Sequence, residues 1–189
     1  MTVSPQNIEG LISGPSAWPP KSVSSPRTIS AVALIFLGGK KGVESDILLI
    51  RRSTTVRSHR GQIGFPGGHA EASDQSPFEC AARETWEEVG IPKESLNFIG
   101  QLPMQHALSG ALVIPVICTT AFDPQNLVLN AREVDSALMI PWWECSLCRA
   151  ERFNFNIFGI WRESVRYQTS SGSIWGLTAK ILESARLRP

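Results

Sequence analysis

Short aliphatic runs alternate along the chain with stretches rich in glycine, proline and charge, and these runs predict buried strands. The clearest run covers residues 29–37, is almost wholly apolar, and is closed by two glycines. A short apolar run with such a boundary is typical of a strand in the interior of a sheet. The segment at residues 51–68 shows many glycines and no strand pattern, so it is predicted to be a long functional loop. Further strands are expected over residues 47–50, 97–102, 112–119 and 137–140.

One helix is defined at both ends by its sequence. Ser76-Pro77-Phe78-Glu79 is a capping box with proline at the first helical position, and Gly90 stops the helix, which predicts a helix over residues 77–89. At about 100° per residue, its residues separate into two faces. The face expected to pack carries Phe78, Ala81, Ala82, Thr85, Trp86 and Val89, and the other carries Arg83, Glu84, Glu87 and Glu88. A second helix is expected over residues 175–187, where apolar residues again have helical spacing.

The length of 189 residues fits one domain with additions. Residues 1–28 are rich in proline and serine and are expected to form an arm, which leaves residues 29–189 for the domain. Hydrophobic residues make up 42% and charged residues 19% of the chain, which indicates a globular protein and excludes collagen-like repeats, coiled coil and bulk disorder. Four scattered cysteines are expected to be reduced.

The net charge is +1, with 18 Lys and Arg against 17 Asp and Glu. No global field therefore draws the chain to nucleic acid or to an anionic membrane, and an acidic ligand needs a local cluster of cations. The longest apolar run is about half the roughly 20 residues that a membrane-spanning helix needs. These observations favour a cytoplasmic protein with a small-molecule partner and no membrane contact, and they disfavour nucleic acid as a partner.

Three glutamates crowd the polar face of the first helix. Glu84, Glu87 and Glu88 stand at i, i+3 and i+4, a spacing at which like charges destabilise a helix by a few tenths of a kcal/mol per pair, about 0.2–0.5, unless they are neutralised. A divalent cation would neutralise them, and ligation by carboxylates alone favours Mg²⁺ or Mn²⁺ over zinc. The alternative is a solvated helix face with Arg83 paired to Glu87. The helix residues alone leave both interpretations open.

The predicted loop begins with a concentration of positive charge. Residues 51–60 contain no acidic residue, and guanidinium groups bind phosphates through paired hydrogen bonds, so a polyanionic ligand is expected here. A solvated basic loop and an RNA-binding patch are the alternatives, although the segment lacks the interleaved aromatic residues on which bases stack. The cationic residues are Arg51, Arg52, Arg57, His59 and Arg60.

The glycines and the helix together resemble a known signature. Gly67-Gly68 followed by Arg83-Glu84-Thr85-Trp86-Glu87-Glu88-Val89-Gly90-Ile91 is similar to the Nudix hydrolase motif, R-E-U-x-E-E-x-G-U behind a glycine loop. The match departs from the commonest form in three places. Asp74 stands where Glu is usual, one extra residue separates it from Arg83, and Thr85 replaces an aliphatic residue. The first two departures resemble the pattern of the coenzyme A pyrophosphatase subfamily. Residues 48–68 also match that subfamily's pattern L-L-T-x-R-S-x3-R-x3-G-x3-F-P-G-G except at Ile50. The resemblance extends over residues 29–182.

The resemblance implies an α/β fold, the Nudix-type α/β/α sandwich with a mixed β-sheet, and a hydrolase dependent on Mg²⁺ or Mn²⁺. Glu84 and Glu88 would be the main metal ligands, assisted by Glu87 and by a carbonyl of the glycine loop, that of Gly68. Glu84 is favoured as the general base and Arg83 as the residue that orients it, although clustered carboxylates share their protons. By the same resemblance, the substrate would be bound by Arg51, Arg52, Arg57, His59, Arg60 and Gln62.

The substrate implied is coenzyme A or an acyl-coenzyme A, cleaved to 3′,5′-ADP and (acyl-)4′-phosphopantetheine. ADP-ribose, a nucleotide sugar and an RNA 5′ end are alternative substrates for the same glutamates. A non-catalytic nucleotide-binding module is the alternative of another class, disfavoured because the arginine and all three glutamates of the motif are intact. A homodimer is left open.

Two further expectations concern residues outside the motif. Glu133 or Asp135 could supply a fourth acidic ligand, with a surface charge as the equal alternative. The tryptophans are expected to pack in the core rather than to stack on an adenine; they are Trp142, Trp143, Trp161 and Trp175.

Overall fold

The computed structural model describes residues 18, 29–38, 45–55, 60–146, 148, 150–157 and 159–186. In this part of the chain the strands form an eight-stranded sheet and a separate three-stranded antiparallel sheet. The strands of the large sheet are β1 (Ile29–Leu37), β2 (Asp46–Arg52), β3 (Ile63–Gly64), β4 (Gly67–His69), β5 (Leu96–Gln101), β6 (Gln105–His106), β7 (Leu112–Thr120) and β8 (Val134–Pro141). The small sheet contains β9 (Glu151–Ile157), β10 (Ile160–Thr169) and β11 (Gly172–Trp175). The helices are α1 (Pro77–Val89), α2 (Trp142–Ser146) and α3 (Gly176–Arg186), with short 3-10 turns at η3 (Lys93–Ser95) and η4 (Pro124–Asn126).

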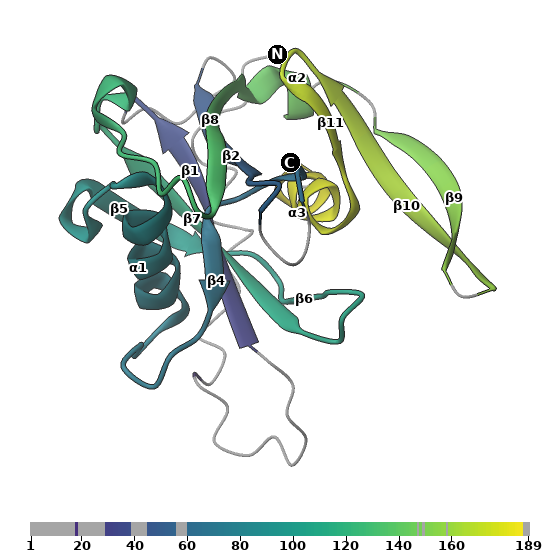
Figure 1. The fold of residues 1–189 in the computed structure, drawn as a ribbon, viewed down its shortest axis with the longest axis horizontal. Helices are drawn as coiled ribbons and strands as arrows, with labels where there is room; N and C mark the ends of the chain where they lie inside the picture. Colours follow the sequence, from purple (N-terminus) through teal and green to yellow (C-terminus); the bar gives the residue numbers. More distant parts are fainter. Residues whose placement is uncertain are drawn as a thin grey trace.

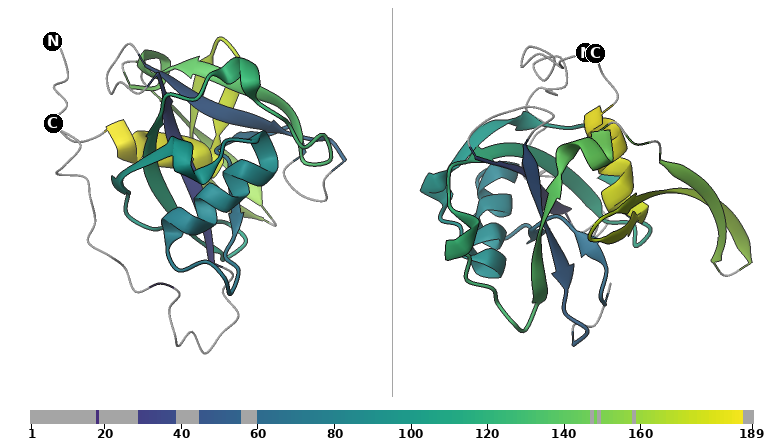
Figure 2. Two further views of the ribbon diagram at one scale, coloured as in Figure 1. Left: turned by 90° about the vertical axis from the view of Figure 1, so that its left-hand side faces the viewer. Right: turned by 90° about the horizontal axis from the view of Figure 1, so that it is seen from above.

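The large sheet is mixed because β1 runs parallel to β7 and antiparallel to its other neighbours. Its main order is β3-β2-β1-β7-β5, with β4 paired to β1, β6 to β7 and β8 to β2. Alternate residues of β1 enter two separate cores, Ala33 and Ile35 on the side of α1, and Leu34 and Phe36 on the side of α3. Helices therefore cover both faces, as the views of α1 and α3 show (Figures 1 and 2). The predicted α/β/α sandwich with a mixed sheet is confirmed.

Helix α1 begins and ends where the sequence predicts. Ser76 Oγ accepts a hydrogen bond of 3.1 Å from the Glu79 amide, and Gly90 closes the helix with φ +76° and an N–H that donates to the Trp86 carbonyl. The predicted division of faces is wrong at two residues, since Trp86 is 57% exposed and Glu88 only 1%. The buried face of the helix includes Cys80 and Glu88 beside Ala81 and Thr85, so its centre is shifted away from Trp86 and toward Glu88.

The segment predicted as a long loop contains two short strands. β3 pairs with β2, and β4 lies antiparallel to β1 with Gly68 opposite Ala31. Both strands are too short for hydrophobic alternation to mark them, which is why the sequence pattern missed them. The pairing of β4 with β1 places the glycines beside helix α1.

The β9–β10 hairpin and β11 were not predicted, and the hairpin projects from the body of the molecule (Figures 1 and 2). The prediction that the four tryptophans pack in the core is wrong for three of them, because Trp143 is 46%, Trp161 71% and Trp175 42% exposed. Trp142 is buried and meets Phe36 edge-on at 5.3 Å between ring centroids.

The four cysteines are free. None of the helices in the described residues is long and apolar enough to span a membrane.

Candidate active site

Helix α1 and strand β4 bring glutamates against glycines. A Cβ on Gly68 would overlap the Glu84 carboxylate, and a Cβ on Gly67 would overlap the Ala31 carbonyl. Gly67 also has φ +147°, a conformation that side-chain-bearing residues rarely adopt. Position 67 therefore requires glycine because of the backbone, and Gly68 makes room for the Glu84 carboxylate.

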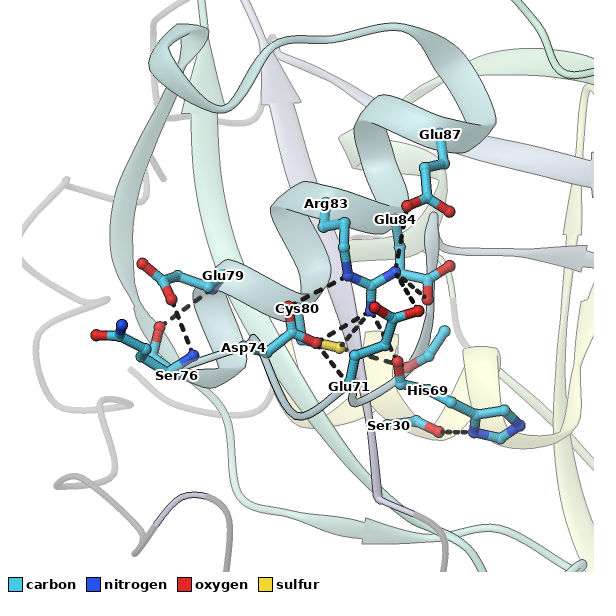
Figure 3. A network of polar contacts seen from close by, with 12 residues as sticks. Ser30, His69, Glu71, Asp74, Ser76, Glu79, Cys80, Arg83, Glu84 and Glu87 are labelled. Carbon is cyan, nitrogen blue, oxygen red and sulfur yellow. Dashed lines mark hydrogen bonds and ion pairs between the residues drawn. The ribbon is translucent and has the colours of Figure 1, made fainter.

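Arg83 lies at the centre of the polar network and contacts several of its residues (Figure 3). Its Nε and Nη2 donate to the two Asp74 carboxylate oxygens at 3.2 and 3.0 Å, and its Nη1 donates to Glu84 Oε1 at 3.0 Å. Further contacts reach Glu87 Oε1 at 3.4 Å and the His69 carbonyl at 2.9 Å. One guanidinium thus ties the loop before the helix to the glutamates on it.

Asp74 anchors the loop end of this network. Burial would raise the pKa of its carboxyl, but hydrogen bonds from Arg83 and the Glu71 amide outweigh burial and lower the pKa. Asp74 is therefore an anionic partner that holds the Arg83 side chain in place. The motif comparison singled out Asp74 as a variant position but did not assign it this contact.

Glu88 is the most deeply buried carboxylate of the site. The Gly67 N–H donates to its Oε2 at 2.9 Å, and Arg52 Nη1 lies 3.6 Å from its Oε1. Burial raises the pKa of Glu88 to about 7, with Glu84 and Glu133 adding repulsion against the opposing effects of Gly67 and Arg52. A carboxylate held this way gains from a nearby cation.

Glu84 lies beside Glu88 and behaves similarly. Burial raises the pKa of Glu84, Arg83 lowers it, and Glu87 and Glu133 raise it further. Glu87 is exposed. The face of α1 thus combines one deeply buried, one half-buried and one exposed glutamate.

Glu133 and Asp135 differ in their relation to these glutamates. The charge of Glu133 acts on both Glu84 and Glu88, whereas Asp135 accepts a hydrogen bond from Ser136 at 3.2 Å. Of the two candidates for a fourth acidic ligand, Glu133 is the one placed near the cluster.

The donor chemistry of the cluster fits a hard divalent cation. Its oxygen donors are carboxylates whose pKa values are raised by burial and mutual repulsion, both of which a cation would offset. Within the ranges that the structure describes, no three His, Cys, Asp or Glu side chains already stand in a metal-binding arrangement. The Gly68 carbonyl faces the Cys80 thiol at 3.7 Å.

The residues of the basic segment are placed differently from one another. Arg52 reaches Glu88, while Arg51 donates to the Ser171 carbonyl at 2.9 Å and to the Gly61 carbonyl at 3.4 Å. Arg51 therefore fastens the segment to the turn before β11. Arg60 is exposed and Gln62 is half-buried. Arg57 and His59 lie outside the described residues.

Sequence reasoning missed two contacts at the edge of the site. Ser30 Oγ and His69 Nδ1 are 2.8 Å apart (Figure 3), and Trp18 Nε1 donates to the Asp74 carbonyl at 3.0 Å. Both contacts join residues distant in the sequence, so no local spacing could have indicated them.

Comparison with known proteins found a domain family and relatives that match this chain. The model of the NUDIX domain matches residues 26–139. A Nudix hydrolase named NudL from Photorhabdus laumondii subsp. laumondii is 36% identical over 167 residues, covering 87% of this chain and 86% of the relative. NudL from Yersinia enterocolitica is 37% identical over 146 residues, covering 74% of this chain and 71% of the relative. Both names describe the relative as uncharacterized.

Solved structures agree with the fold. The MutT protein from Methanosarcina mazei Go1 matches with a TM-score of 0.50 and 26% identity, covering 68% of this chain and 86% of that one. A MutT/nudix family protein from Enterococcus faecalis matches with a TM-score of 0.52 and 15% identity, covering 87% of this chain and 62% of that one. The family match includes β4 and α1, the two elements that carry the site.

Proposed function

This chain belongs to the NUDIX family of hydrolases, and from that premise we propose that it hydrolyses the diphosphate bond of coenzyme A or an acyl-coenzyme A. The products would be 3′,5′-ADP and (acyl-)4′-phosphopantetheine. The observation that carries the proposal is the packing of Glu84 and Glu88 against the Gly67–Gly68 strand, with Arg83 bound to Glu84.

Mg²⁺ or Mn²⁺ would be held by Glu84 and Glu88, with Glu87 and the Gly68 carbonyl assisting. Such a cation neutralises the charge that develops on the diphosphate and lowers the pKa of a water molecule. Glu84 accepts the proton of the attacking water, and Arg83 keeps the Glu84 carboxylate oriented through its 3.0 Å hydrogen bond. Asp74 in turn keeps Arg83 oriented.

The choice of coenzyme A rests on the subfamily pattern over residues 48–68 and on the positive charge of that segment. A substrate with a 3′-phosphate as well as a diphosphate carries more negative charge than ADP-ribose, and paired guanidinium contacts suit it. Arg52, Arg57 and Arg60 are proposed to bind phosphates, together with His59 and Gln62. Arg51 contributes by shaping the segment.

A substrate panel tests this proposal. Purified protein is incubated with coenzyme A, an acyl-coenzyme A, ADP-ribose, nucleotide sugars and triphosphorylated RNA, each with Mg²⁺ and with Mn²⁺, and the products are separated by chromatography. We expect the highest kcat/KM for coenzyme A or its acyl form, and reversible loss of activity in a chelator. Preferred cleavage of ADP-ribose or RNA would replace the substrate, and nucleotide binding without any turnover would favour the non-catalytic alternative.

A further inference from the structure

A pocket of about 500 Å³ opens beside the glutamates, between the large sheet, β11 and the start of α3. This volume is within the range of small-molecule sites. The pocket walls are mainly apolar, and the side chains that form them include Val32, Ile63, Phe65, Leu108, Phe155 and Leu177.

Two residues connect the pocket to the carboxylate cluster. Gly67 and Arg52 line it, and both also contact Glu88, Gly67 through its N–H at 2.9 Å and Arg52 through Nη1 at 3.6 Å. A group attached to a phosphate bound at the glutamates would therefore reach the pocket past Gly67 and Arg52.

The charge of the residues that line the pocket indicates which kind of chemical group fits in it. Arg52 is the one charged residue among the described residues that line the pocket, and it already faces the buried Glu88 carboxylate. A phosphate placed in the pocket away from Arg52 would lose water without gaining a cation from the walls, which is unfavourable. An uncharged chain needs only apolar contact and a few hydrogen bonds, for which Gln62, Ser109 and Thr178 provide polar groups.

We propose that this pocket binds the uncharged half of the substrate, a chain with branched methyl groups and amides that is esterified to one phosphate. The charged nucleotide half then lies outside the pocket. This inference rests on the proposed function, since the pantetheine arm of coenzyme A is such a chain. It assigns the two halves of one substrate to two separate surfaces.

Two substitutions test the assignment by different means. A Cβ on Gly64 would meet Thr178 Oγ1 at 3.6 Å, an ordinary contact on the pocket wall, so Gly64→Val is directed into the pocket and fills part of it. Leu108 is 65% exposed at the pocket wall, so Leu108→Glu adds a charge there at little risk to the fold. Ile160→Glu adds the same charge on the projecting hairpin, where the residue is 56% exposed, and is the matched control.

Binding of the two reaction products to the full chain is measured by calorimetry with Mg²⁺. We expect Gly64→Val and Leu108→Glu each to weaken 4′-phosphopantetheine binding about tenfold, the equivalent of about 1.4 kcal/mol, and to change 3′,5′-ADP binding less than about twofold. Ile160→Glu is expected to leave both affinities unchanged. Loss of 3′,5′-ADP binding instead would assign the pocket to the nucleotide half, and no change in either affinity would remove it from substrate binding.

The hydrolysis of coenzyme A by the unmodified protein separates two kinds of failure. If this protein cleaves coenzyme A but the pocket variants bind 4′-phosphopantetheine normally, the pocket assignment is wrong and the proposed function stands. If the unmodified protein neither cleaves coenzyme A nor binds 4′-phosphopantetheine, the proposed function and the pocket assignment are both wrong.

Discussion

At the scale of single residues, the site depends on two glycines, because neighbouring groups occupy the space that their side chains would need. Gly68 has no side chain, and the Glu84 carboxylate occupies the space where its Cβ would lie. The Gly67 N–H donates a hydrogen bond of 2.9 Å to Glu88 Oε2. Two adjacent glycines thus position two glutamates that are four residues apart on a helix.

Substituting alanine for Gly68 should therefore displace Glu84 while leaving the fold intact, because the overlapping group is the end of a flexible side chain. A displacement of about 1 Å costs about a hundredfold in rate, so we expect kcat/KM to fall by about that factor with little change in the unfolding midpoint. Steady-state kinetics and circular dichroism test this. Unchanged kinetics would show that Glu84 need not occupy this position.

Glu88 should make the stability of the metal-free protein depend on pH. Burial raises the folded pKa of Glu88 to about 7 from its ordinary value of 4.5, so the folded state holds the proton more tightly than the unfolded state does. The resulting stabilisation is fully present below about pH 4.5 and is lost as the pH rises through about 7. Urea unfolding in chelator should show this decrease in the wild type.

Glu88→Gln removes the titrating group while preserving its size. The decrease in stability between pH 4.5 and 7 should become smaller in this variant, and kcat should fall by about a hundredfold or more because a charge that binds the cation is gone. The same pH dependence in both proteins would assign the titration to another group.

At the scale of elements, one guanidinium joins a loop to a helix. Arg83 lies on α1 and Asp74 in the loop that follows β4, and their paired hydrogen bonds fix the approach of the loop to the helix. The same side chain reaches Glu84. The geometry of the site therefore depends on a side chain with several donors in a rigid plane.

Arg83→Lys keeps the charge but not this plane, since an ammonium group cannot bind both Asp74 oxygens and also reach Glu84 in the same geometry. Partners that orient ligands typically contribute ten- to a hundredfold to activity or metal affinity. We expect kcat to fall by about that range with KM changed less, and the cation concentration for half-maximal activity to rise. An equal loss after Lys93→Arg, which alters an exposed pair with Glu79, would indicate a general effect of surface charge instead.

At the scale of the whole molecule, Trp18 contacts the loop that carries Asp74. Trp18 is half-buried, packs on the core beneath α1, and donates through Nε1 to the Asp74 carbonyl at 3.0 Å. The division into an arm over residues 1–28 and a domain over residues 29–189 stays a prediction, and we propose that Trp18 is a point at which the predicted arm is held to the domain.

Two substitutions at Trp18 separate packing from hydrogen bonding. Trp18→Phe removes the donor and should lower the free energy of unfolding by about 1 kcal/mol. Trp18→Ala also removes the packed ring and should lower it further, by about 2 kcal/mol in total or more. Urea unfolding measures both. Equal stability of all three proteins would mean that Trp18 does not hold the arm to the domain.

The sequence by itself determined the parts of this protein that depend on neighbours along the chain. Helix α1 has its start at Ser76 and its end at Gly90 because capping involves residues within one turn. The long strands β1 and β7 follow from apolar runs, because a strand in a sheet interior is covered on both faces. The motif glutamates and Arg83 were identified by their spacing on one helix.

The tertiary structure alone decided which of these residues meet. The burial of Glu88 and the exposure of Trp86 depend on which side of α1 faces the sheet, and the role of Arg51 depends on a carbonyl at Ser171, 120 residues away. The pocket joins Gly67 to Phe155 and Leu177, and Trp18 reaches Asp74. Local sequence patterns do not predict such contacts. Packing and desolvation depend on distances in space, and many sequences can satisfy the same distances in different ways.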